Sequence, residues 1–463
     1  MLKVKSLIIT FYKGFLFLVC YAVFAFLLGI AIPYILTPSR TALIVALSFT
    51  VSYIMLSKIY GGMDIGTRKS RSIIFSMILV LLFADLIAHL FLCIMDYTVI
   101  HGRHFVYEAP TLLVTAYATQ VLLVIGAAYV GNGVFFALFK PQKSLVIYAK
   151  DADIGAFVKK IESLEKQYSV KATLPYEPAD PERAFRLIDK AEAVFFYGLT
   201  ATERAALVEY AYRMKTDIYY SIEMNDVVAI GGKMVSFEDT PVIYSPVKNN
   251  DMVFRIVKKL ADLFFSLIGI IVLTPLFIVV AIVIKSEDGG PVFYKQPRIT
   301  IAGKRFNLVK FRSMRPEVGD IHRSVTENDD RITRVGHVIR KFRIDEFPQL
   351  FNVLLGDMSL VGPRPEMVEN VRTYSKELPE FAYRQRMKAG ITGLAQVYGK
   401  YNTLPKDKLM YDLMYIEQAN IWLDLKIILR TVLVLFTPEE STEAFREPEE
   451  DEAQTDEQKK EGI

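Results

Sequence analysis

Residues 331–366 have the sequence RITRVGHVIRKFRIDEFPQLFNVLLGDMSLVGPRPE, which brings paired acids, several cations and a proline-bounded turn together. Two adjacent carboxylates, Asp345 and Glu346, follow a basic run that includes Arg340. Further along, Arg364 stands between two prolines, which leave its backbone little freedom and pre-organise its guanidinium fork for bidentate phosphate binding. This combination indicates phosphate and metal chemistry.

The two acids can have separate roles. An aspartate can attack a phosphorus centre and carry the phosphoryl group as an acyl phosphate, provided that it is ionised and nearby cations offset the phosphate charge. A neighbouring glutamate can hold Mg²⁺, which takes carboxylate and phosphate oxygens together. The same residues also fit the first turn of a surface helix, where acids meet the helix dipole favourably. Spacing alone leaves both interpretations open.

The composition places part of the chain in lipid. Of the 463 residues, 52% are hydrophobic, and the mean hydropathy is +0.28; ordinary globular chains contain about 45–50% apolar residues. The formal net charge is +4, yet the tail from Pro438 is strongly acidic, so the rest is more basic. Dispersed basic residues favour anionic lipid or phosphate partners and predict no nucleic acid partner. Cys20 and Cys93 both lie in apolar runs, which excludes a disulfide framework or a cysteine-based zinc site.

Apolar segments fill the first third of the chain and predict a four-helix transmembrane bundle over residues 1–142. The first segment is too long for a removable signal peptide and lacks a small-residue cleavage site. Basic residues gather on one side of the bundle, so the positive-inside rule puts both of its ends in the cytoplasm. Asp85 is costly in lipid, and a functional role and structural pairing both remain open for it, with pairing favoured. The segments are approximately residues 7–36, 41–56, 73–95 and 110–139.

Residues 143–250 show a different pattern, in which short apolar runs alternate with amphipathic helices. This alternation predicts a cytoplasmic, Rossmann-like α/β domain with a mostly parallel sheet. Thr200 and Glu203 have the spacing of a helix capping box. The turn after the first predicted strand carries Asp151 and Asp153 where a GxGxxG motif would bind a pyrophosphate. We therefore expect a regulatory or assembly role for this domain.

A further apolar run, residues 263–284, decides the topology of everything after it. It is long enough to span, but a span would separate the acid pair from any nucleotide-activated substrate in the cytoplasm. Pro275 removes one helical N–H and its ring clashes with the Ile271 carbonyl, while the Thr274 hydroxyl can satisfy a freed carbonyl. We predict a re-entrant helix over residues 258–285 that bends at Thr274-Pro275, with a kinked fifth span as the alternative.

The segments on either side of the acid pair complete this region. Residues 292–299 and 304–314 predict a small β-hairpin whose second strand projects Lys310 and Arg312. Residues 409–436 predict one helix lying in the membrane interface, with Trp422 among its apolar residues. Residues 438–463, rich in Glu and Asp, predict an acidic disordered tail.

These motifs resemble, in order, the bacterial sugar transferase family. The resemblance covers about residues 252–436 and implies a mainly α catalytic domain over residues 251–437, with the re-entrant helix and the small hairpin. It makes the surface-helix and fifth-span interpretations minor ones. The preceding spans and α/β domain resemble the large form of the family, which starts capsule, exopolysaccharide or O-antigen synthesis. The motifs are residues 292–314, 329–366, 387–400 and 415–432.

The resemblance also implies roles for matched residues. Asp345 matches the family's nucleophile, and Glu346 matches the acid beside it that ligates Mg²⁺. Arg340 and Arg364 match arginines that serve the active site, and Lys310 matches the lysine of the KFR motif, in which Arg312 is the arginine.

Three matched positions depart from the family pattern, and at one of them Ser313 replaces a common Thr. Thr274-Pro275 stands where the family usually has Ser-Pro at the bend of the re-entrant helix, and the hydroxyl is retained. Lys400 stands where many relatives have Arg, so a bidentate phosphate or uridine contact at that position is in doubt, because Lys is a point charge.

The implied reaction has two displacements. Asp345 attacks the β-phosphorus of a UDP-sugar and releases UMP, and polyprenyl (undecaprenyl) phosphate then takes the sugar phosphate, usually that of glucose or galactose. The acceptor's phosphate stays at the inner face of the bacterial cytoplasmic membrane, so the catalytic and α/β domains are expected there. The resemblance also suggests a homodimer. A catalytically inactive scaffold or sensor of polysaccharide assembly is one alternative. A transporter of lipid-linked sugars is another, although four spans with one buried acid make a poor path.

Overall fold

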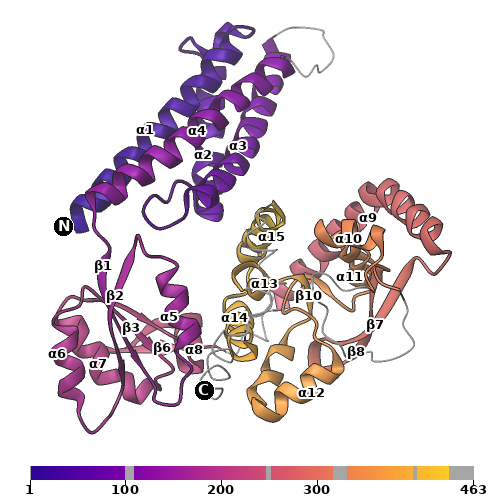
Figure 1. Cartoon of the computed structure of the whole chain (residues 1–463). Helices are drawn as coiled ribbons and strands as arrows, with labels where there is room; N and C mark the ends of the chain where they lie inside the picture. Colours follow the sequence, from indigo (N-terminus) through magenta and orange to yellow (C-terminus); the bar gives the residue numbers. More distant parts are fainter. Residues whose placement is uncertain (1, 100–108, 247–251, 316–330, 400–403, 437–463) are drawn as a thin grey trace, which may run out of the picture. The chain divides into compact units, whose positions relative to one another are not determined.

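The computed structural model describes residues 2–99, 109–246, 252–315, 331–399 and 404–436 (Figure 1). The chain divides into two compact units, Met1–Glu223 and Met224–Ile463, which are described separately. Within the described ranges it is mostly helical, with long apolar helices and a parallel sheet. Lys400 and the predicted disordered tail lie outside the described residues.

The first unit begins with long apolar helices that pack side by side (Figure 1). α3 packs against both α2 and α4, and α1 packs against α4. Each of these helices is long and apolar enough to cross a membrane, and so is α9 in the second unit. Their bounds are Leu2–Gly29 for α1, Arg40–Tyr60 for α2, Ser70–Val99 for α3 and Pro110–Leu138 for α4.

Polar side chains inside this helical region pair with one another. The Asp85 side chain is buried, and its Oδ1 accepts a hydrogen bond of 3.2 Å from Gln120 Nε2. The same amide nitrogen donates to the carbonyl of Cys20 at 3.0 Å. Asp85 therefore has a structural partner on another helix, which is the interpretation that the sequence favoured. Cys20 and Cys93 are buried and form no disulfide.

The rest of the first unit contains a parallel sheet with strand order β2-β1-β3-β4 (Figure 1). Successive residues of β1 and β3 point to opposite faces, as a strand requires. Ile147 and Phe196 pack with α6 and α7 on one face, whereas Val146 and Phe195 pack with α5 on the other. The elements are β1 Gln142–Tyr148, α5 Gly155–Glu162, β2 Tyr168–Pro175, α6 Pro181–Ile188, β3 Ala193–Tyr197, α7 Ala201–Arg213 and β4 Asp217–Tyr220.

The N-terminus of α7 carries the predicted capping box. The Thr200 hydroxyl accepts from the Glu203 N–H, and the Glu203 carboxylate accepts from the Thr200 N–H at 2.8 Å. Glu223 adds a second carboxylate, which accepts from the Ala201 N–H at 3.1 Å. These acids occupy the donors that a phosphate would use at a helix N-terminus.

The second unit is built around α9, Met252–Asp288, and the predicted hairpin of β7 and β8 follows it (Figure 1). Before α9, α8 packs against α14, and β5 pairs with β6. The remaining elements form the region of the acid pair. The bounds are α8 Met224–Gly231, β5 Lys233–Phe237, β6 Thr240–Tyr244, β7 Phe293–Ile299, β8 Arg305–Phe311, α10 Arg334–Lys341, η4 Ile344–Glu346, α11 Gln349–Leu354, β9 Ser359–Val361, α12 Val368–Glu377, η5 Pro379–Arg386, β10 Gly390–Thr392, α13 Leu394–Tyr398, α14 Pro405–Gln418 and α15 Ile421–Phe436.

The single C-terminal helix predicted for residues 409–436 is wrong, because α14 and α15 are separate helices. The break occurs at Ala419 and Asn420. Asn420 Oδ1 accepts from the Leu423 N–H at 2.9 Å, and its carbonyl accepts from the Asp424 N–H at 3.0 Å. Asn420 thus acts as the N-cap of α15, and a capping residue starts a new helix where apolar periodicity alone predicts continuity.

α9 presents one stripe of residues to the rest of its unit and apolar residues elsewhere. Its buried residues recur at intervals of about three to four, or multiples of these, as a helix face requires, and Phe277 packs edge-on against Phe311 with ring centroids 5.4 Å apart. The other faces expose large apolar side chains along the whole helix. The Thr274 hydroxyl donates to the Ile270 carbonyl at 2.7 Å, one residue before the carbonyl that Pro275 leaves without its helical donor. The buried residues are Lys258, Ser266, Phe277, Val280 and Ile284.

Candidate active site

The acid pair lies on η4, which a tight turn joins to α10. Thr333 caps α10 by accepting from the Gly336 N–H at 2.9 Å. Gly336 itself is required by close approach, because a Cβ there would collide with the carbonyl oxygen of Ser313. At the other end of α10, Arg343 adopts a left-handed conformation with φ of 53° and redirects the chain into η4. Asp345 follows this turn directly, so the position of α10 determines where its carboxylate lies.

Glu346 is the centre of the charged cluster. Its Oε1 lies 3.0 Å from Lys310 Nζ on β8 and 3.0 Å from Arg364 Nη2. The Glu346 side chain is only 15% exposed. Burial alone would raise the pKa of Glu346, but Lys310, Arg364 and Arg343 together hold it well below its ordinary value. Glu346 therefore remains an anion, and the structure brings together three residues that the sequence predicted for one site.

The pKa of Asp345 is shifted in the direction opposite to that of Glu346. Burial raises its pKa, Lys310 and Arg340 oppose the rise, and the charge of Glu346 adds to it; the net shift is upward. The adjacent acids are therefore distinguished by their surroundings, with Glu346 the more acidic and Asp345 the more basic. A more basic carboxylate is the better nucleophile once ionised, which suits Asp345 to attack.

Arg364 is held in place by two further arginines. Arg384 donates to the Arg364 carbonyl at 2.8 Å, and Arg298 donates to the Pro365 carbonyl at 3.1 Å. Arg384 is 5% exposed and pairs with Asp412, whose Oδ2 lies 2.9 Å from Arg384 Nε. Burial lowers the pKa of Arg298 to about 10, so Arg298 stays charged at neutral pH. These contacts fix the backbone on which the Arg364 guanidinium is presented.

Sequence reasoning missed Arg298 and Arg384. Arg298 lies in the predicted hairpin two residues after Gln296, with no acid nearby in the sequence to mark it. Arg384 lies in the segment YRQRMK, where Arg386 is equally prominent. Only the tertiary contacts distinguish the two, because Arg384 is buried whereas the Arg386 side chain is 49% exposed.

Arg312 lies outside the Glu346 cluster. Its guanidinium forms a bidentate ion pair with Asp288, in which Nη1 lies 2.8 Å from Oδ2. Arg312 is only 7% exposed. Phosphate binding by Arg312 stays a prediction. Thr274 and Pro275 lie within α9, and Lys400 lies outside the described residues.

The residues present fit Mg²⁺ only if substrate phosphates and water supply most of its ligands. Among the residues that the structure describes, no group of three or more His, Cys, Asp or Glu side chains could hold a metal. Among the described residues, Glu346 pairs with Lys310 and Arg364 through Oε1, which leaves Oε2 as the oxygen through which it would take the ion. Mg²⁺ is commonly bound by one or two carboxylates together with substrate phosphates and water, and this donor set matches that mode.

Comparison with known proteins assigns the region that carries this site. Residues 253–438 match the family model for bacterial sugar transferase. Over 190 residues the chain is 40% identical to a UDP-glucose:undecaprenyl-phosphate glucose-1-phosphate transferase from Caulobacter vibrioides, a match that covers 39% of this chain and 70% of the relative. The chain belongs to the bacterial sugar transferase family.

Longer relatives match over a similar length of this chain. An enzyme from Klebsiella pneumoniae with the same name as the Caulobacter relative is 42% identical over 198 residues, which is 42% of each chain. A UDP-N-acetylgalactosamine-undecaprenyl-phosphate N-acetylgalactosaminephosphotransferase from Aeromonas hydrophila is 40% identical over 190 residues, or 40% of this chain and 45% of the relative. The match thus spans less than half the length of these two relatives.

We expect Arg384→Ala to destabilise the protein by about 3–5 kcal/mol, because it leaves the buried Asp412 carboxylate without its cation. Asp412 already has one oxygen, Oδ1, with no hydrogen-bond partner among the described residues. The control is Arg386→Ala, which removes an exposed partner 3.7 Å from Glu417 and should cost about 0–1 kcal/mol. Thermal unfolding of the full chain in detergent compares them, and equal midpoints for the two variants would contradict the assignment.

Proposed function

We propose that this sugar transferase moves a hexose-1-phosphate from a UDP-sugar to undecaprenyl phosphate, the first membrane step of exopolysaccharide, capsule or O-antigen synthesis. The observation that carries the proposal is the cluster in which Lys310 and Arg364 meet Glu346 beside Asp345, inside the family-matched residues. The named activities of the relatives support this reaction class. Because those names include two different sugars, UDP-glucose is the first donor to test and UDP-N-acetylgalactosamine the second.

Asp345 is the proposed nucleophile. One carboxylate oxygen forms a bond to the β-phosphorus of the donor while the bond from that phosphorus to the bridging oxygen of UMP breaks, so UMP leaves with the electron pair. An oxygen of undecaprenyl phosphate then attacks the same phosphorus, which releases Asp345 and gives the diphosphate-linked sugar. Lys310, Arg340 and Arg364 offset the negative charge that gathers on the phosphates.

Mg²⁺ is the proposed cofactor, and Glu346 is the residue that would hold it. The ion supplies neutralisation of diphosphate charge when it is bound. The low pKa of Glu346 keeps that side chain ionised at physiological pH, so it does not compete with Asp345 for a proton. Glu346 also orients Lys310 and Arg364 through its Oε1.

The packing of α9 supports a re-entrant course through the membrane. α9 contacts its own unit near its start, middle and end: Lys258 pairs with Asp424 at 2.6 Å, Phe277 packs on Phe311, and Asp288 binds Arg312. A straight helix of 37 residues is about 55 Å long, whereas the hydrocarbon core is about 30 Å thick. A straight crossing would therefore carry charged parts of this unit into lipid, while a helix that returns to its starting face avoids that cost.

The remaining parts of the proposal concern the membrane setting. We place α1–α4 as a four-helix transmembrane bundle, with the Rossmann-like sheet domain and the catalytic domain on the cytoplasmic face of the bacterial inner membrane. The exposed apolar side of α15, which includes Ile421, Trp422 and Leu425, supports a position in the membrane interface. The homodimer suggested by the family resemblance stays a prediction.

Asp345→Asn should lower turnover by about 10³-fold or more, because an amide cannot form the acyl phosphate. UMP release from UDP-glucose with undecaprenyl phosphate measures turnover, and intact-protein mass detects the covalent sugar phosphate. Asp357→Asn is the control, since Asp357 pairs with Lys304 at 3.5 Å, away from the cluster. Wild-type turnover in Asp345→Asn would refute the nucleophile. If the wild-type protein released no UMP from either donor, the inactive scaffold would be the better account.

Lys310→Met should move the acidic limb of kcat/KM for UMP release to higher pH. Lys310 lowers the pKa of Asp345, so its removal leaves burial and Glu346 to raise that pKa further. Because Asp345 must be ionised to attack, activity then appears only at higher pH. Lys304→Met removes an exposed lysine of the same hairpin and should leave the limb in place. A shift to lower pH in Lys310→Met would contradict the assignment.

Single cysteines on either side of α9 test its course. Thr240→Cys lies before the helix and Lys295→Cys after it, and both positions are exposed. A membrane-impermeant maleimide should label neither cysteine in intact spheroplasts and both after lysis. The native Cys20 and Cys93 are buried, so the unsubstituted protein gives the background. Labelling of one site from outside would show that α9 spans the membrane.

A further inference from the structure

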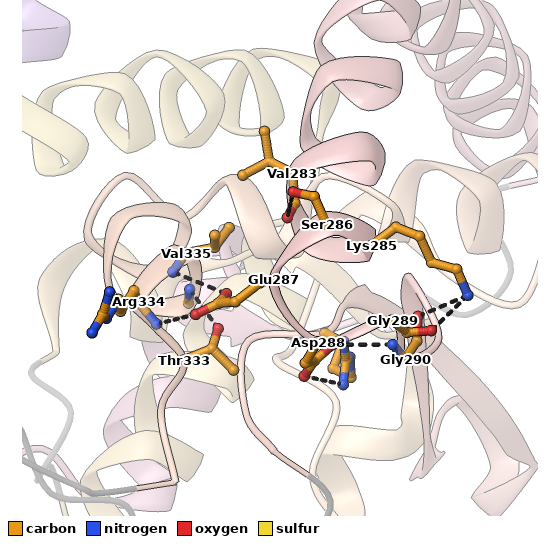
Figure 2. A network of polar contacts seen from close by, with 12 residues as sticks. Val283, Lys285, Ser286, Glu287, Asp288, Gly289, Gly290, Thr333, Arg334 and Val335 are labelled. Carbon is orange, nitrogen blue, oxygen red and sulfur yellow. Dashed lines mark hydrogen bonds and ion pairs between the residues drawn. The ribbon is translucent and has the colours of Figure 1, made fainter.

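The last turn of α9 carries two carboxylates that bind elements of the active site (Figure 2). Glu287 Oε1 accepts a hydrogen bond from the Arg334 N–H at 2.8 Å, and Oε2 accepts from the Val335 N–H at 3.3 Å. Thr333 caps the same helix by accepting from the Gly336 N–H. The N-terminus of α10 is therefore capped both by its own chain and by the end of α9.

Asp288, the next residue, binds Arg312, which directly follows β8. Both of its carboxylate oxygens meet the Arg312 guanidinium. Its Oδ1 also accepts from the Gly290 N–H at 3.1 Å (Figure 2). Gly290 leaves room for this pair, since a Cβ there would collide with the guanidinium of Arg312. Arg312 in turn continues the pairing of the hairpin, because its N–H donates to the Val292 carbonyl at 2.9 Å.

These two contacts fix the elements that deliver the reacting groups. α10 is eight residues long, about 12 Å, and the turn at Arg343 joins it to Asp345. Arg312 lies two residues beyond Lys310 on the same arm of the hairpin. A shift of α10 relative to α9 would move the adjacent Asp345 and Glu346 together, and a shift of β8 would move Lys310, so either shift would separate Lys310 from the acid pair.

The apolar contacts of α9 do not by themselves determine how α10 and β8 are aligned with α9. Ile284 and Phe277 pack against Ile339 of α10 and Phe311 of β8, and such burial is non-directional. Hydrogen bonds to two specific backbone N–H groups and a two-pronged ion pair are directional. The carboxylates therefore add alignment to an interface that apolar packing already holds together.

We propose that Glu287 and Asp288 are positioning residues, through which the end of the membrane helix aligns α10 and β8 and so holds Asp345 and Lys310 in reacting geometry. The proposal rests on the proposed function for its effect on catalysis. It also assigns α9 a second role besides membrane attachment, because the position of its last turn determines the geometry of the acid pair.

The kinetic test compares Glu287→Ala and Asp288→Ala with Ser286→Ala in the full chain, using UDP-glucose, or UDP-N-acetylgalactosamine if that is the donor that the wild-type protein uses. Ser286 is the matched control because its hydroxyl donates to the Val283 carbonyl of its own helix (Figure 2). We expect kcat for UMP release to fall about 10–100-fold in the two alanine variants, because a displacement near 1 Å costs about 10²-fold. KM for the donor should stay within about 2-fold.

A conservative variant distinguishes positioning from simple loss of structure. Glu287→Gln keeps one acceptor oxygen for the α10 N–H groups, so it should recover part of the kcat that Glu287→Ala loses. The thermal unfolding midpoint of Glu287→Ala should match that of Ser286→Ala, whereas Asp288→Ala should lower it because the buried Arg312 guanidinium loses its carboxylate. Equal kcat in the alanine variants and Ser286→Ala, or a loss of kcat in Glu287→Ala that follows a lowered unfolding midpoint, would overturn the proposal.

Hydrogen exchange provides a readout that does not need activity. In the full chain in nanodiscs, Glu287→Ala should speed backbone amide exchange over residues 334–346 relative to wild type, with no change over residues 405–418. Ser286→Ala should leave both segments unchanged. If the wild-type protein released no UMP but the exchange difference appeared, the proposed function would fail and the coupling of α9 to α10 would stand. If exchange over residues 334–346 were unchanged in Glu287→Ala, the positioning proposal would fail whatever the activity.

Discussion

The second unit depends on one carboxylate that is ionised although it is mostly buried. Removing an anion from water costs several kcal/mol unless cations compensate, and Glu346 meets this requirement by accepting from both Lys310 and Arg364. These cations come from β8 and from the turn after β9, so the charge requirement brings together segments that are distant in sequence. In the proposed reaction, the same cations would offset the negative charge of the donor diphosphate. Because they are already held in place, little reorganisation would remain to be done.

Fixing the cations requires a further layer of buried charge. Arg298 and Arg384 use their guanidinium groups to bind the carbonyls of Pro365 and Arg364, and Asp412 balances Arg384. Each removal from this set would leave an uncompensated charge in a region of low dielectric constant. We expect few substitutions to be tolerated in this layer, which fixes the backbone of Arg364 through the bonds to its carbonyl and to that of Pro365. The two prolines beside Arg364 give the same restriction from within the chain.

Much of this organisation could be predicted from the sequence because it depends on local sequence patterns. Apolar length predicted α1–α4, strand and helix alternation predicted the parallel sheet, and the hairpin that carries Lys310 followed from its two apolar strands. What the sequence could not predict is pairing across long separations. Nothing local distinguishes Arg384 from Arg386, and nothing local shows that Arg312 is bound to Asp288. The predicted helix over residues 409–436 failed for a related reason, because the capping bonds of Asn420 compete with an otherwise continuous apolar pattern.

α9 packs against its own unit on one side and exposes apolar side chains on the others, and its residues differ between these faces. One stripe faces its own unit, with Lys258 near the start and Glu287 and Asp288 at the end, while the other faces expose apolar side chains throughout. Polar groups at both ends are stable only where water or protein can pair with them, which agrees with the proposed return of α9 to the edge of the hydrocarbon layer. The last turn is also the part that binds α10 and β8, so in that proposal the acid pair is held near the same level. The proposed acceptor, a lipid-linked phosphate, is confined to the headgroup layer, and a nucleophile that is tied to a membrane helix would meet it at that depth.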